Sequence, residues 1–175
     1  MSRTHSRRLR LAVLCVLSLA AATAAACTSA TREQAQGADA DSVRLERLPG
    51  FTRIPGYRVS VARDGRVAFA WLASGDSARP AADSLAPATA AALIDAGSAA
   101  GVGRLPERLR EHPDLCGPWA TDHGTAVVTL FYAAGRTARV EDYLGCRDAP
   151  AELRAYEARI DTIARTGRWT SAYAP

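Results

Sequence analysis

The stretch YRVSVARDGRVAFAW, residues 57–71, decides the fold, because two alternating segments flank a turn within it. Apolar residues alternate with polar or small ones on both sides of Arg63-Asp64-Gly65, as in the half-buried strands of a hairpin. A two-residue turn at Asp64-Gly65 would place the two apolar sets on opposite faces. A three-residue loop with Gly65 in the left-handed conformation places them on one face, so we expect this loop. The expected pairs are Val61 with Val67, Val59 with Phe69 and Tyr57 with Trp71.

A second hairpin of the same design is predicted in VTLFYAAGRTARV, residues 128–140. A three-residue loop with Gly135 left-handed pairs Leu130 with Ala138 and Val128 with Val140, again on one apolar face. Each hairpin precedes a stretch with helical periodicity, at residues 87–100 and 150–166. We therefore expect an α+β fold of two ββα units, with a four-stranded antiparallel sheet and two helices packed on one face.

The first 26 residues have the pattern of a bacterial export signal, with a basic start and an apolar run at residues 11–26. This run of about 16 residues is shorter than the roughly 20 that span a membrane, so we expect it to be cleaved. Residues 24–27, AAAC, resemble the bacterial lipobox, in which the cysteine, here Cys27, receives diacylglycerol and becomes the new N-terminus. The lipobox usually has leucine where Ala24 stands, so plain Ala-x-Ala cleavage is the alternative.

These features predict three segments: a signal peptide at residues 1–26, a lipid-anchored flexible tether at residues 27–50, and a single α+β domain at residues 51–175. The tether is polar and alanine-rich without apolar periodicity, and about 20 such residues would let the domain float roughly 25 Å from its anchor. We expect an exported protein in the cell envelope, attached to a membrane on its periplasmic or outer-surface side.

The basic charge of the whole chain comes from its first residues. The chain has 22 basic residues, all arginine, and 18 acidic ones. Four of the arginines precede the apolar run: Arg3, Arg7, Arg8 and Arg10. Without them 18 arginines face 18 acidic residues, so the mature protein is formally neutral. This balance argues against nucleic acid as a partner, since such binding needs a surplus of cations.

The cysteines predict one disulfide. Cys15 lies in the apolar run and Cys27 is the expected lipid site, which leaves Cys116 and Cys146 as a pair in an oxidising compartment. Their bond would close a loop of about 30 residues and stabilise the fold by roughly 3 to 4 kcal/mol on the chain-entropy model. The alternative is that both thiolates bind a metal, although two cysteines do not complete a tetrahedral site.

One loop gathers the side chains best suited to bind a metal. His112, Asp114 and His123 could hold zinc or another divalent ion, and Cys116 could join them if it were unpaired. The segment has neither His-x-x-x-His nor Cys-x-x-Cys spacing, and its prolines and glycines are typical of a surface loop. We therefore expect no metal and no other cofactor.

The same loop holds the predicted contact with a ligand or partner. Trp119 follows Pro118 outside any apolar stripe, so we expect it to be exposed, with Asp122 and His123 nearby. Trp71 and Tyr156 lie on predicted apolar stripes and should be core residues. The chain has no nucleophile elbow, phosphate loop or dinucleotide fingerprint, so catalysis is not expected.

The order of several short segments resembles an uncharacterised bacterial family, domain of unknown function 6438. The segments are YRVSV at 57–61, DGRV at 64–67, VEDYLGC at 140–146, and then Ala149-Pro150, Leu153, Ile160-Asp161, Gly167 and Trp169. The resemblance covers roughly residues 51–169. It implies a fold and a location, because members are often exported or lipid-anchored, and it implies no catalytic residues. Many members have a Cys-x-x-x-Cys-Pro-like segment where this chain has FTRIPGY at 51–57.

Two functions follow as hypotheses. The first is an envelope lipoprotein whose domain binds an unidentified protein or small ligand, or has a structural role, without catalysis. The second is a metal-dependent envelope enzyme that uses the loop from His112 to His123.

Overall fold

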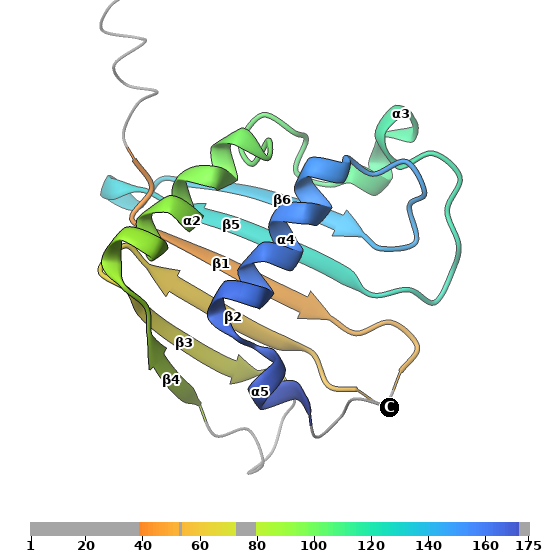
Figure 1. The fold of residues 1–175 in the computed structure, drawn as a ribbon. Coiled ribbons are helices and arrows are strands. Elements are labelled where there is room, and N and C mark those ends of the chain that lie inside the picture. The colour runs from red at the N-terminus through yellow and green to blue at the C-terminus, as the bar shows by residue number, and fades with distance from the viewer. Residues whose placement is uncertain (1–38, 53, 73–79, 172–175) are drawn as a thin grey trace, which may run out of the picture. The chain divides into compact units, whose positions relative to one another are not determined.

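The central feature of the fold is a six-stranded antiparallel sheet (Figure 1). The computed structural model describes residues 39–52, 54–72 and 80–171. The strands are β1 (Ser42–Leu48), β2 (Tyr57–Ala62), β3 (Arg66–Trp71), β4 (Ala81–Ser84), β5 (Thr125–Phe131) and β6 (Thr137–Tyr143). Their spatial order is β4-β3-β2-β1-β5-β6, so β1 lies between the two hairpins and joins them.

The fold is α+β as expected, but the expected four-stranded sheet with two helices is wrong. The sheet of the described residues also contains β1 and β4. The expected flexible tether at residues 27–50 includes β1, and the expected domain starts at residue 51, whereas the folded unit begins at Asp39. In β1, Val43 and Leu45 are fully buried and alternate with partly exposed polar residues. Alternation with a period of two indicates a strand. In the sequence this short pattern is hard to see, because the residues before β1 are polar and alanine-rich.

Both predicted hairpins have the expected register. Strands β2 and β3 pair Val61 with Val67, Val59 with Phe69 and Tyr57 with Trp71. Strands β5 and β6 pair Leu130 with Ala138 and Val128 with Val140. The loop between β2 and β3 has three residues and ends in Gly65 at φ +95°, the left-handed region that glycine adopts without steric cost. The connection between β5 and β6 is longer, at residues 132–136, and both Ala134 (φ +59°) and Gly135 (φ +73°) are left-handed in it. The alternation of apolar residues therefore predicted both registers and both left-handed glycines correctly, and the three-residue loop for the first hairpin.

Two long helices, α2 (Pro87–Ala99) and α4 (Ala151–Ala164), lie side by side across one face of the sheet (Figure 1). The shorter elements are η1 (Leu109–Glu111), α3 (Pro113–Cys116), η2 (Ala133–Gly135) and α5 (Gly167–Thr170). The core between helices and sheet includes Leu45, Val59, Phe69, Leu93, Ile94, Leu130, Leu153 and Ile160. Within the described ranges, none of the helices has the length and apolarity needed to cross a membrane.

The opposite face of the sheet is mainly polar. On β1 and β2, Arg44 and Arg58 point away from the buried valines, and Arg58 pairs with Glu46 at 3.8 Å. On β6, Arg139 pairs with Glu141 at 3.1 Å. Such partly exposed pairs contribute little stability. Because its side chains are mainly polar, this face is mainly a solvated surface.

Candidate functional site

The cysteine pair fastens the end of α3 to the chain after β6. The Sγ atoms of Cys116 and Cys146 lie 2.03 Å apart, at disulfide distance, and both residues are about 1% exposed. The backbone reinforces the link, because Ala120 N–H donates to Gly145 O at 3.0 Å and Asp148 N–H donates to Cys116 O at 3.1 Å. The pairing expected from the sequence is thus seen, and it holds the start of the loop in place.

Trp119 is held at the surface by a stack of side chains. The Arg110 guanidinium lies 4.2 Å from the centroid of the Trp119 ring and 4.8 Å from that of Tyr143. The two rings meet edge to face with centroids 6.2 Å apart. Trp119 remains 47% exposed, as the sequence led us to expect. Each cation–π contact of this exposed kind contributes about 0.5 to 1 kcal/mol, which orients the indole without burying it.

Asp122 and His123 lie on the same loop and are both exposed. The Tyr143 hydroxyl donates to Ala120 O at 2.8 Å and accepts from the His123 N–H at 3.3 Å, so one phenol supports both ends of the turn. Asp122 has φ +67°, a left-handed conformation that aspartate tolerates better than most residues. The structure therefore brings the three predicted contact residues together on one supported loop.

A second exposed aromatic side chain adjoins this loop. Phe51 is 92% exposed, and its N–H donates to Asp122 O at 3.0 Å. Gly50 makes the close approach possible, because a Cβ on Gly50 would lie 2.3 Å from Asp122 O. We call the surface formed by Phe51, Arg110, Trp119, Asp122 and His123 the Trp119 patch. Phe51 and Arg110 are not among the contact residues predicted from the sequence; the available signal for Phe51 is a large aromatic residue directly after Pro49-Gly50.

The proposed metal ligands do not come together. His112 and Asp114 are exposed at the start of α3, His123 lies on the loop supported by Tyr143, and Cys116 is at disulfide distance from Cys146. Across the part of the chain that the structure describes, no group of three His, Cys, Asp or Glu side chains is arranged to hold a metal ion.

A separate cluster of charged groups lies between α4 and the sheet. Arg47 on β1 contacts Glu157 and Asp161 on α4, each at 2.9 Å. Asp161 also accepts hydrogen bonds from the Tyr57 hydroxyl at 2.7 Å and the Thr166 hydroxyl at 3.0 Å. This cluster was not predicted, because its members are about 100 residues apart in the chain and meet only through the sheet order.

Glu157 is the most perturbed member of this cluster. It is 2% exposed, and its Oε1 atom has no hydrogen-bond partner among the residues described. Burial raises the pKa of Glu157 to about 7, and the Arg47 charge opposes this shift without cancelling it. Ion-pair networks that hold a fold together also perturb pKa values. We interpret the cluster as structural, because it joins β1 and β2 to α4.

Neither a known protein family nor a curated protein matches this chain.

Proposed function

We propose that this chain is a cell-envelope lipoprotein whose folded domain binds a protein partner through the Trp119 patch, without catalysis. The observation that carries the proposal is the stack of Arg110, Trp119 and Tyr143, which presents an exposed indole beside the disulfide. Tryptophan, tyrosine and arginine are the residue types that contribute most energy at protein interfaces. A preorganised aromatic side chain loses little entropy on binding, which favours such a role.

The shape and chemistry of the patch favour a protein over a small molecule. Phe51 and Trp119 project from two loops that touch through the Asp122 carbonyl, and both are exposed, at 92% and 47%. Two exposed aromatic side chains on touching loops, with an exposed carboxylate and imidazole on the same loop as Trp119, resemble the apolar centre and polar surroundings of an interface. The partner surface should therefore offer an apolar pocket for the indole.

Replacement of Trp119 by alanine should weaken partner binding at least about tenfold, because a central interface tryptophan is typically a hot spot. To measure this, a photo-reactive amino acid replaces His123 in the full-length chain in cells, and its crosslinked products are compared with and without Trp119→Ala. We expect a discrete protein adduct that disappears in the variant.

The matched control is Tyr132→Ala. Tyr132 also stacks with an arginine, with the Arg136 guanidinium 4.4 Å from its ring, but at the opposite end of the β5–β6 hairpin. The adduct should persist in this variant. An adduct that survives Trp119→Ala, or is lost equally in Tyr132→Ala, would contradict binding through the Trp119 patch.

The anchoring of the domain forms the second part of this proposal. Cys27 lies outside the described residues. Lipid attachment at Cys27 is supported by the lipobox-like residues 24–27 and by the resemblance of residues 51–169 to a family whose members are often exported. Mass spectrometry of the protein from its native membrane fraction should find a mature N-terminus at Cys27 with a diacylglyceryl mass. The variant Cys27→Ser should retain the signal peptide and lack this mass. A free thiol at Cys27, or a mature N-terminus elsewhere, would refute lipid attachment.

A further inference from the structure

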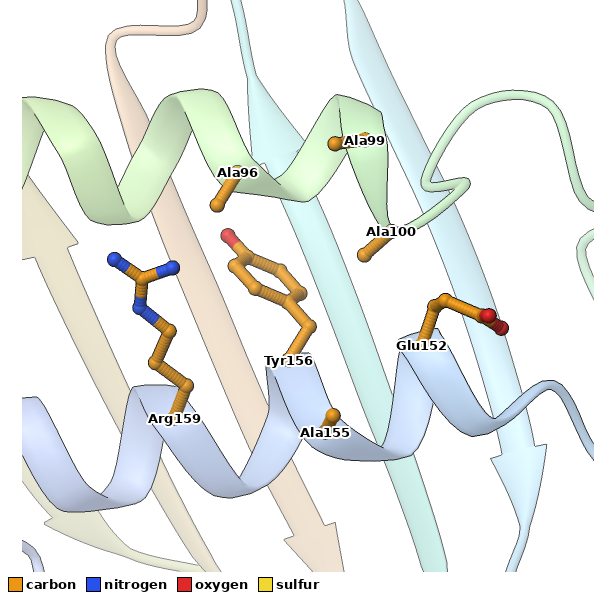
Figure 2. Close-up of a pocket in the computed structure, with 7 residues that line it drawn as sticks. All are labelled: Ala96, Ala99, Ala100, Glu152, Ala155, Tyr156 and Arg159. Carbon is orange, nitrogen blue, oxygen red and sulfur yellow. The ribbon is translucent and has the colours of Figure 1, made fainter.

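A groove between helices α2 and α4 is distinct from the Trp119 patch. It has a volume of about 330 Å³ and is lined by alanine methyl groups of both helices, among them Ala96, Ala99 and Ala155 (Figure 2). This volume is at the lower end of the range for small-molecule sites. Alanines alone would form only a shallow apolar channel, so the significance of the groove depends on its polar groups.

The first polar group is the hydroxyl of Tyr156. Tyr156 is 3% exposed, and its hydroxyl oxygen has no hydrogen-bond partner among the described residues. Gly97 makes room for it, because a Cβ there would lie 2.8 Å from the hydroxyl oxygen. A buried hydroxyl without a partner is costly, and such groups are rare in folded proteins. A ligand in the groove could supply the missing acceptor.

The charge state of the phenol makes it a donor. Burial raises the pKa of Tyr156 well above its usual value, so the hydroxyl keeps its proton at any physiological pH. A protonated phenol without an internal acceptor can donate one hydrogen bond to a ligand.

The second polar group is the guanidinium of Arg159. It lines the same groove, and Figure 2 shows it on the side of the Tyr156 hydroxyl, whereas Glu152 lies toward the opposite side. Arg159 forms no ion pair within the described ranges. Helical spacing places Tyr156 and Arg159, three residues apart, on one face of α4. A neutral donor and a cationic donor that share a groove are suited to an anionic acceptor.

We propose that the α2–α4 groove binds a small alkyl carboxylate, with its carboxylate at Tyr156 and Arg159 and its apolar chain along the alanines. The Tyr156 hydroxyl donates one hydrogen bond to the carboxylate, and the Arg159 guanidinium supplies its counter-charge. The alanine methyl groups give the alkyl chain an apolar surface without polar competition. Glu152 disfavours a second anionic group on the opposite side, so the groove selects a monocarboxylate.

Calorimetric titration of the purified full-length protein with octanoate tests this site, with octanol and octylamine as probes that have the same chain. Octanoate should bind, whereas octanol and octylamine should bind at least about tenfold more weakly, because hydrogen bonds to a charged group are the stronger ones. Equal binding of octanol, stronger binding of octylamine, or no octanoate binding at millimolar concentration would overturn the proposal.

Two variants locate the site. Tyr156→Phe should weaken octanoate binding about tenfold while leaving the thermal stability of the free protein unchanged or higher, because it removes an unpaired buried hydroxyl. Arg159→Gln should weaken binding by a similar factor. The matched control is Arg66→Gln, since Arg66 is exposed on the opposite face of the sheet, and this variant should bind octanoate normally. Unchanged octanoate affinity in both groove variants would also overturn the proposal.

Discussion

Replacement of Arg47 by leucine is expected to lower the free energy of unfolding by about 3 to 5 kcal/mol at pH 8, because it leaves a buried carboxylate without its counter-charge. Arg47 contacts Glu157 and Asp161 at 2.9 Å each, and Glu157 is 2% exposed. In the variant, Asp161 keeps its hydrogen bonds from Tyr57 and Thr166. Glu157, in contrast, loses the positive charge that contributes most to stabilising its ionised form.

The cost of Arg47→Leu should depend on pH in a defined direction. The pKa of Glu157 is about 7 in the folded protein and near its ordinary value of 4.5 when unfolded. Burial therefore destabilises the ionised form, so the contribution of Glu157 to stability is greatest below pH 4.5, falls as the pH rises toward 7, and then levels off. Without Arg47 this pKa rises further, so the fall is larger and continues above pH 7. The variant should accordingly lose less stability at pH 4.5 than at pH 8.

Urea denaturation followed by circular dichroism at both pH values measures these effects. The matched control is Arg58→Leu, which removes a neighbouring arginine whose pair with Glu46, at 3.8 Å, is partly exposed, and should cost about 1 kcal/mol or less. The double variant Arg47→Leu with Glu157→Leu should recover part of the loss, because no buried charge then remains unpaired. If the free energy of unfolding of Arg47→Leu at pH 8 equals or exceeds that of Arg58→Leu, the ion pairs of Arg47 do not stabilise the fold as proposed.

Local alternation was enough to predict the hairpins, because a one-residue shift in register would have turned every apolar side chain to the other face. The sheet order was not predictable in this way. Strand β1 pairs with β2 on one side and with β5 on the other, joining Ser42 to both Ala62 and Phe131. No local pattern encodes a partner about 90 residues away. For the same reason the cluster around Arg47 could not be predicted from the sequence, because it forms only when β1 takes its central place in the sheet.

The candidate sites show the same division between local and long-range information. Exposure of Trp119 could be predicted, since it follows Pro118 in a loop without periodicity. Its stack with Arg110 could not, because it depends on how the segment before α3 passes the end of β6. Tyr156 was correctly predicted as a core residue, being 3% exposed. Its unpaired hydroxyl was not foreseen, because that depends on the close approach of α2 at Gly97.

Removal of the disulfide through the double variant Cys116→Ala with Cys146→Ala is expected to lower the free energy of unfolding by about 3 to 4 kcal/mol. The cysteines are separated by 30 residues in sequence, and on the chain-entropy model a loop of about this size restricts the unfolded chain by that amount. Both side chains are about 1% exposed, so alanine also leaves a small cavity that adds to the loss. Thermal unfolding should therefore shift downward by roughly 10 °C or more.

A reductant supplies the control for this variant. Dithiothreitol should destabilise the natural protein to a similar extent and leave the double alanine variant unchanged, and unreduced peptide mapping should link the peptides that contain Cys116 and Cys146. Because Trp119 pairs with Cys146 through the backbone, loss of the bond should also loosen the Trp119 patch and weaken partner crosslinking at His123. Two free thiols in the natural protein would contradict the disulfide.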